Sequence, residues 1–159
     1  AKPKSAWQIE TVMIDALAVV VKHISQDTDV MALCDIRIAP RHKYSNTTVA
    51  GAWKTPAKGI ELQYDPGGTP DIEQPVQNIR IRASCYGEDD YQASRVYNTL
   101  VHVCRNANRI VVTTSNGIAF LYWLLLDSSP ETQFNNDISM PFVQVFLTAR
   151  IAEVPITAS

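Results

Sequence analysis

The stretch from Val76 to Ala107 constrains the fold most, because it reads as a strand, a sharp turn and a helix in succession. Its first part alternates between an apolar face with Ile79, Ile81, Ala83 and Cys85 and a second face with Arg80, Arg82, Ser84 and Tyr86. A period of two residues predicts a half-buried strand. We therefore expect one face of this strand to lie on the core and the other to point away from it.

A turn and a helix follow this strand. Gly87 gives the backbone freedom to turn. Asp89, with Gln92 three residues later, has capping-box spacing, and the acidic pair Asp89 and Asp90 suits the positive end of a helix dipole. Apolar residues then recur at three- and four-residue spacing: Ala93, Val96, Tyr97, Leu100, Val101 and Cys104. This stripe predicts a helix packed on the strand, ended by the left-handed conformation that asparagines between positions 106 and 108 tolerate.

The residues before this unit predict helices and a long loop. After a short tail over residues 1–6, a helical spacing over residues 7–25 predicts an amphipathic helix. A short helical turn through Cys34 and a strand over residues 35–39 should follow. Residues 40–75 are rich in proline and glycine, so we expect a long loop that contains one strand, Gly59 to Tyr64.

The residues after the unit predict a meander of strands. Residues 109–114 and 118–126 are strand-like and flank a tight turn at residues 115–117, so they should pair as a hairpin. Residues 127–139 are polar and predict a loop. Residues 141–154 alternate strongly and predict a long final strand.

Together these elements predict one α+β domain over residues 1–159, with a mostly antiparallel sheet and two helices packed on one face. A hydrophobic content of 46% is ordinary for a globular protein with its own core. The formal net charge of -2 argues against a general nucleic-acid binder, although it leaves local basic patches open. We expect no membrane span, because the longest apolar run, residues 118–126, is about half of the ~20 residues that a spanning helix needs. We interpret this run as a buried strand.

The start of the chain, AKPKSAWQIE, lacks the apolar segment of a signal peptide, so we expect synthesis in the cytosol. The three cysteines lack a CxxC pair, and we expect buried free thiols rather than a disulfide: Cys34, Cys85 and Cys104. His23, His42 and His102 lie on different elements without metal-ligand spacing. No nucleophile elbow or phosphate-binding loop is present in the sequence. We therefore expect no catalytic residues, no metal and no cofactor.

Two features are candidates for partner contact. The first is basic and aromatic, and no acidic residue interrupts it between positions 41 and 58: Arg41, His42, Lys43, Trp53, Lys54 and Lys58. Such a loop can contact an acidic partner surface or, without sequence specificity, the phosphates of DNA. The alternative is an ordinary solvated loop.

The second candidate is the face of the sheet opposite the helices. It combines aromatic side chains with arginines, a composition typical of protein interfaces: Arg80, Arg82, Tyr86, Phe142, Phe146 and Arg150. The alternative is that the long loop of the same chain covers this face. Either arrangement keeps these side chains away from the helix-covered core.

The order of parts resembles the tail terminator proteins, also called tail completion or minor tail proteins, of long-tailed bacteriophages. An amphipathic first helix precedes I-R-A-S-C-Y-G (Ile81 to Gly87), an A-x-x-V-x-x-x-L helix (Ala93 to Leu100) and an I-V-V strand (Ile110 to Val112). The closing segment is D-x-x-x-P-F-V-Q-V-F-L-T-A-R-I, from Asp137 to Ile151. The resemblance covers about Ile9 to Ala152.

This resemblance implies a structural virion protein and not an enzyme. Its expected form is a homo-oligomeric ring, usually of six subunits, at the head-proximal end of the tail. Its expected partners are the tail tube protein and the head–tail connector proteins. Two alternatives stay open: another neck component, such as a head-closure or connector protein, and a small cytosolic α+β enzyme or ligand-binding domain with the long loop as a lid.

Overall fold

A computed structural model describes residues 15–40, 43–45, 50–65, 76–115 and 117–153. Its helices are α1 (Ala16–Ser25), α2 (Thr28–Cys34) and α3 (Asp90–Asn106). Its strands are β1 (Ile38–Ala39), β2 (Tyr44–Ser45), β3 (Trp53–Lys54), β4 (Gly59–Tyr64), β5 (Val76–Tyr86), β6 (Asn108–Thr114), β7 (Gly117–Leu126), β8 (Glu131–Asn135) and β9 (Met140–Glu153).

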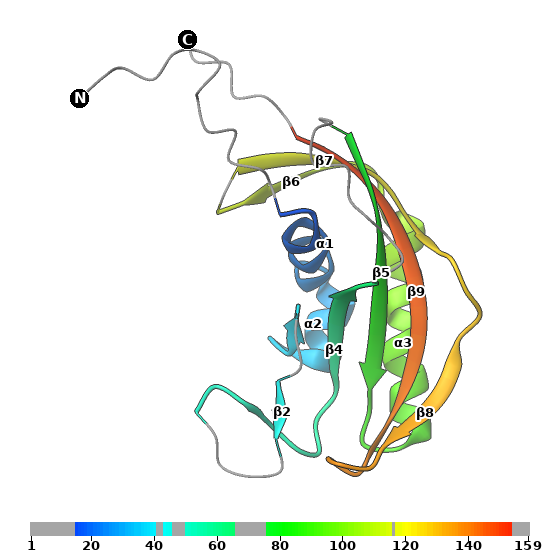
Figure 1. Cartoon of the computed structure of the whole chain (residues 1–159). Coiled ribbons are helices and arrows are strands. Elements are labelled where there is room, and N and C mark those ends of the chain that lie inside the picture. Colours follow the sequence, from blue (N-terminus) through cyan, green and yellow to red (C-terminus); the bar gives the residue numbers. More distant parts are fainter. Residues whose placement is uncertain (1–14, 41–42, 46–49, 66–75, 116, 154–159) are drawn as a thin grey trace.

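The main sheet has the order β1-β4-β5-β9-β7-β6, and β8 also pairs with β9. All its pairings are antiparallel except that of β1 with β4, whereas β2 and β3 form a separate parallel pair. The strand β9 is central, since β5 pairs with it from Val76↔Ala152 to Tyr86↔Phe142 while β7 and β8 share its other side. The curved sheet holds the helices on one face (Figure 1). The predicted α+β class is confirmed.

The core lies between this sheet and the helices. On β5 and β9 the apolar faces predicted from the alternation are buried, and Ile81 and Leu147 are both 0% exposed. The helices contribute their apolar stripes, such as Val96 and Leu100 of α3, to the same cluster. All three cysteines are free and buried, as predicted.

The turn between β5 and α3 depends on the close approach of backbone atoms at Gly87 as well as on helix capping. Asp89 caps α3, because its Oδ1 accepts a hydrogen bond from Gln92 N at 2.8 Å. Gly87 does not adopt a left-handed φ. A Cβ at this position would lie 2.1 Å from Ala93 N. The glycine is therefore needed for close approach of the helix rather than for backbone freedom.

The ends of two helices differ from the prediction in part. The helix α3 ends at Asn106, within the predicted stretch, but without a left-handed asparagine, since its C-cap Ala107 has φ -79° and the positive φ of 54° falls on Arg109. The helix α1 begins at Ala16 with Asp15 as its N-cap, whose Oδ1 accepts from Leu17 N at 3.1 Å. Its predicted part over residues 7–14 lies outside the described residues.

Three further predictions need correction. Residues 127–139 were expected to be a loop but contain β8, whose polar sequence suits a strand exposed on the sheet margin and held by backbone pairing with β9. The strand expected over residues 35–39 shrinks to Ile38–Ala39, because Asp35 takes a φ of 54° to end α2. The long loop also contains the short pair β2 and β3 in addition to the predicted β4.

Candidate interaction surface

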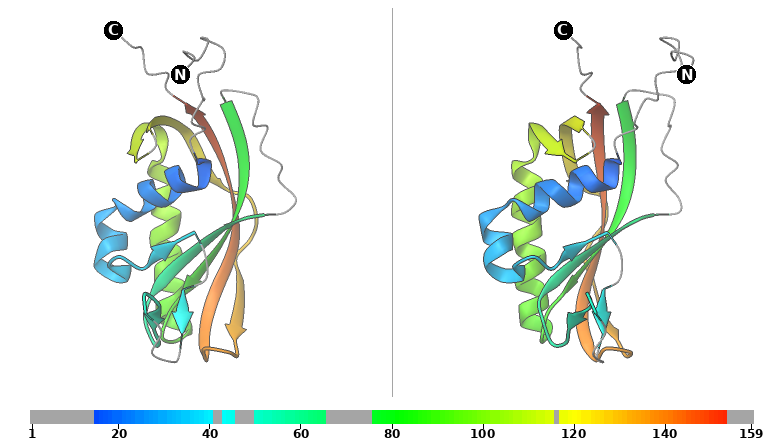
Figure 2. Two further views of the ribbon diagram at one scale, coloured as in Figure 1. Left: turned by 60° about the vertical axis from the view of Figure 1, so that its left-hand side comes forward. Right: turned by 90° about the vertical axis from the view of Figure 1, so that its left-hand side faces the viewer.

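The face of the sheet opposite the helices carries most of the predicted site residues. Arg80 and Arg82 on β5 and Phe146 and Arg150 on β9 lie on this outer face. The described helices all lie on the other face (Figure 2). The outer face is therefore the first place to look for a partner surface.

Arg80 is engaged by its own chain. Its Nη1 lies 2.9 Å from Asp65 Oδ2, and its Nε lies 3.0 Å from Asp127 Oδ2. The guanidinium also stands 4.4 Å from the centroid of the Phe146 ring. Because Asp65 follows β4 and Asp127 follows β7, this side chain ties together the sheet on both sides of β5 and β9. Arg80 thus organises the outer face, with its positive charge already balanced.

The other two arginines have uncharged partners among the residues that the structure describes. Arg82 donates from Nη2 to Gln63 Oε1, a neutral acceptor, at 2.5 Å. Arg150 is exposed and lies 5.6 Å from the ring centroid of Tyr122. Tyr122 in turn makes an edge-to-face contact with Phe120 at 4.7 Å. An arginine beside aromatic rings is a frequent anchor of protein interfaces.

The end of the outer face near Tyr86 is covered by the chain itself. Tyr86 is only 4% exposed, and its ring lies 4.9 Å from Phe142 and 4.7 Å from Tyr44. Tyr44 also meets Trp53 edge-on at 5.0 Å, so the β2–β3 pair packs over this end of the sheet. At this end of the outer face, the long loop therefore covers the sheet, which is the alternative to a partner interface that the sequence left open. Tyr86 and Trp53 serve this second cluster, and Phe142 is half-buried in it.

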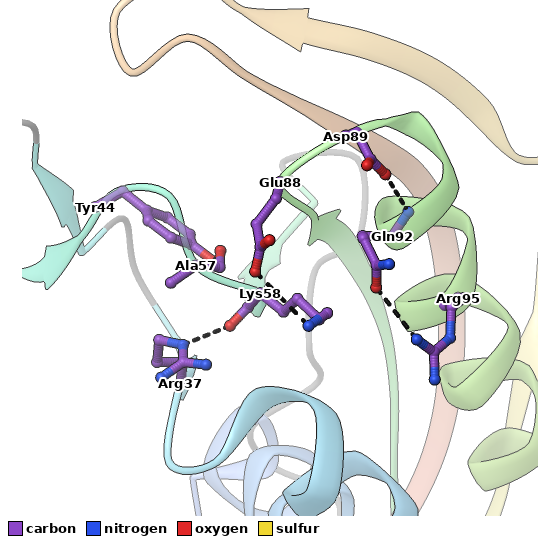
Figure 3. A network of polar contacts seen from close by, with 8 residues as sticks. All are labelled: Arg37, Tyr44, Ala57, Lys58, Glu88, Asp89, Gln92 and Arg95. Atoms are coloured by element: carbon purple, nitrogen blue, oxygen red, sulfur yellow. Dashed lines mark hydrogen bonds and ion pairs between the residues drawn. The ribbon is translucent and has the colours of Figure 1, made fainter.

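The basic loop is partly balanced by nearby acidic groups. Lys58 Nζ lies 3.7 Å from Glu88 Oε1, and the Lys58 carbonyl accepts from Arg37 Nε at 2.6 Å (Figure 3). The backbone N–H of Lys43 donates to Glu61 Oε1, a carboxylate that is 5% exposed. Lys54 is exposed. The lysines of the basic loop therefore differ, since Lys58 is paired with a carboxylate whereas Lys54 is exposed to solvent. Arg41 and His42 lie outside the described residues.

The described residues offer little for covalent or metal chemistry. Burial raises the pKa of Cys34 to about 11 and of Cys104 to about 12, and that of Cys85 well above its usual range. These thiols are therefore poor nucleophiles at neutral pH. Among the residues described, no group of His, Cys, Asp and Glu is placed to hold a metal ion. Nor does any helix in this part of the chain have the length and apolarity to cross a membrane.

One described cavity, of about 330 Å³, lies beside α1. It is lined by Asp15, Ala18, Val21, Lys22, Ser25, Pro40, Thr114 and Ser115. Asp15 in this lining is already the N-cap of α1. Of the described residues of the long loop, only Pro40 lines the cavity, so the cavity does not lie under a lid formed by residues 50–65.

Sequence reasoning missed several residues of the outer face. Phe120 and Tyr122 were read as part of a buried strand, although both are only half-buried in β7. The register shift of β7 between Leu121 and Trp123 breaks the simple alternation that would have placed them. Asp65 and Asp127, the partners of Arg80, follow strands from distant parts of the sequence, and no local pattern marks them.

Comparisons with known proteins give a fold likeness only. No protein-family model matches the sequence, and no curated protein matches it significantly. A solved structure described as "Virion of native gene transfer agent (GTA) particle" contains a chain that superposes with a TM-score of 0.52 at 14% identity. The match covers 86% of this chain and 94% of that chain. The two chains share their fold along nearly their whole lengths.

Proposed function

We propose that this chain is a structural protein of a tailed, phage-like virion. The observation that carries the proposal is the fold likeness to a chain of a gene transfer agent virion, which includes 94% of that chain. A likeness limited to one motif or to an inserted domain would cover a much smaller share of the two chains. The outer sheet face, with arginines beside aromatic rings, supplies the contact surface that an assembly protein needs.

Within the virion, the proposed position is the head-proximal end of the tail. The protein forms a closed ring of six copies there, caps the tail tube and joins it to the head connector. Support for this finer role comes from the resemblance between the order of its sequence segments and that of tail terminator proteins, above all from Ile81 to Gly87 and from Asp137 to Ile151. The long final strand β9, in the centre of the sheet, contains most of that second segment.

The proposed contact residues divide by environment. Arg82, Phe146 and Arg150 face neighbouring subunits or the connector from the outer face. Arg41, Lys43, Lys54 and Lys58 belong to the basic loop, whose proposed roles are connector contact or non-specific contact with DNA in the channel. Tyr86 contributes through the packing that supports this surface, because only 4% of it is exposed.

The test is particle assembly in cells that lack the protein, with assembled tails viewed by electron microscopy. We expect tails of irregular, extended length that are not joined to heads, and rescue by the wild-type chain supplied in trans. Normal tails joined to heads would refute the proposal. Tails of normal length that fail to join, with purified protein that binds connectors but not tube ends, would move the chain to a head-closure position.

A further inference from the structure

Exposed apolar side chains gather on two separate parts of this molecule. Nine large hydrophobic residues of the described chain are exposed, and four of them lie on β6 and β7: Val111, Ile118, Leu125 and Leu126. Two more, Met31 at 49% and Ile36 at 81%, flank the end of α2. Single exposed hydrophobic residues are common, but clusters of this kind mark contact surfaces.

The first cluster extends the outer face of the sheet. Val111 is 60% exposed and pairs directly with Phe120, so both side chains point to the same face. Leu125, which is 53% exposed, stands opposite Thr148 on that face. Arg109 precedes Val111 on β6, and Arg150 lies over Tyr122. We define the β7 patch as Val111, Ile118, Phe120, Tyr122 and Leu125 with Arg109 and Arg150.

The second cluster has the opposite charge. Asp35 is exposed, lies one helical turn after the exposed Met31 and immediately precedes Ile36. The basic residue next to them, Arg37, directs its Nε to the Lys58 carbonyl at 2.6 Å. We define the α2 corner as Met31, Asp35 and Ile36. It combines exposed apolar side chains with an exposed carboxylate, whereas the β7 patch combines exposed apolar side chains with arginines.

The two surfaces cannot meet within one molecule. The strands β1 and β6 are the two ends of the main strand order, and α1 packs against both of them. The β6–β7 hairpin lies above α1 and α2 lies below it (Figure 1). Complementary surfaces that one chain cannot bring together are free to join two chains.

We infer that the β7 patch of one copy of this chain binds the α2 corner of the next copy. The occupant of the β7 patch is thus a second copy, chosen by charge complementarity between Arg109 and Arg150 on one side and Asp35 on the other. Because two different surfaces meet, the contact is head-to-tail, and such contacts close into rings when the rotation permits. The inference deepens the proposed function by naming the subunit contact of its ring.

The test is self-association of the purified chain by sedimentation velocity over a series of concentrations. Ile36→Ser and Val111→Ser each remove one apolar centre, and Tyr91→Ser is the matched control, since Tyr91 is 70% exposed on α3 outside both surfaces. We expect each patch variant to raise the dissociation constant about tenfold, the scale of truncating a central interface residue, and the control to leave it unchanged.

Two results of this experiment overturn the inference. One is a wild-type chain that stays monomeric at every attainable concentration. The other is a pair of patch variants that associate as the control does. If Val111→Ser instead lowers the melting temperature while association is unchanged, Val111 stabilises the fold of its own chain, and the second copy is ruled out as the occupant of the patch.

Cysteine cross-linking tests whether the surfaces meet each other or themselves. Ile36→Cys and Val111→Cys are made in a Cys34→Ala background, which removes the native thiol nearest to Ile36 in sequence. We expect disulfide-linked dimers when the two variants are mixed and oxidised, and none from either variant alone. Dimers from Ile36→Cys alone in equal yield would mean a two-fold symmetric contact and overturn the head-to-tail arrangement.

These outcomes are separate from those that test the proposed function. A chain that associates through both surfaces but is dispensable for tail assembly keeps this inference and refutes the proposed function. A chain that is required for tail assembly but never associates through these surfaces keeps the proposed function and refutes this inference.

Discussion

The contact between Gly87 and the start of α3 predicts that one added methyl group will destabilise the whole domain. In Gly87→Ala the new Cβ would lie 2.1 Å from Ala93 N and 2.6 Å from Gln92 C. These neighbours are backbone atoms of the first helical turn, so no flexible side chain can move aside. Ordinary contact distances begin near 3.4 Å, and the helix must therefore shift by more than an ångström, by roughly 1.3 Å at the closest atom.

Such a shift strains packing along the helix. The apolar stripe of α3, including Ala93 and Val96 at 0% exposure, is packed against the sheet. Overpacking a tight site typically costs about 1–3 kcal/mol and occasionally more, and a backbone clash belongs at the upper end, about 3 kcal/mol. For a domain of this size each kcal/mol lowers the melting temperature by about 2–4 °C, so we expect a fall of roughly 6–12 °C.

Urea and thermal unfolding monitored by circular dichroism measure this effect. The matched control is Gly51→Ala, because an added Cβ there has nothing within 4 Å and meets only the strain of a φ of 79°. That strain costs roughly 1–2 kcal/mol, less than the backbone clash. A Gly87→Ala variant as stable as the wild type, or more stable than Gly51→Ala, would refute the close-approach explanation.

Three further predictions concern charge and burial. Arg80→Met should cost about 1 kcal/mol or less, because the Arg80 pairs are partly exposed, and added salt should shrink the difference in urea unfolding. Burial lowers the pKa of His23 from its ordinary 6.5, although a hydrogen bond to Val103 and the Asp27 carboxylate act the other way. The unfolded chain therefore binds more protons than the folded chain near this pH. We expect the free energy of unfolding to fall as pH drops through 6.5 and to level off below the pKa of His23 in the folded chain. A His23→Gln variant that keeps the same pH dependence would contradict this. Ellman's reagent at pH 8 should label the thiols of the folded chain roughly a hundredfold more slowly than an ordinary cysteine, because burial raises their pKa values. Full labelling should follow only after unfolding. Fast labelling of the folded chain would contradict the burial of Cys34, Cys85 and Cys104.

The sequence predicts the elements whose pattern is local and regular. The strand β5, the helix α3 and the strand β9 all follow from side-chain periods of 2 or 3.6, which arise because one face of each element is buried. The cap Asp89 follows from the same kind of local signal. In contrast, β8 is polar except for Phe134, which is itself exposed, and it is a strand because β9 supplies its backbone partners.

The candidate surface was predicted only in part for a related reason. Arginines and aromatic residues could be assigned to the outer face from alternation alone. The burial of Tyr86 depends on Tyr44, which lies 42 positions earlier and reaches it through the β2–β3 pair. The balance of charge on Arg80 likewise depends on Asp65 and Asp127. Contacts between distant segments of this kind leave no periodic trace in the sequence.

The central position of β9 has a consequence for synthesis of the protein. It is the last described strand to leave the ribosome, yet it pairs with β5, β7 and β8. Until it emerges, the sheet has a gap at its middle, and the flanking strands expose edges that can pair with other nascent chains. Assembly of the sheet therefore waits for β9 and is governed by the closure of contacts between segments far apart in sequence.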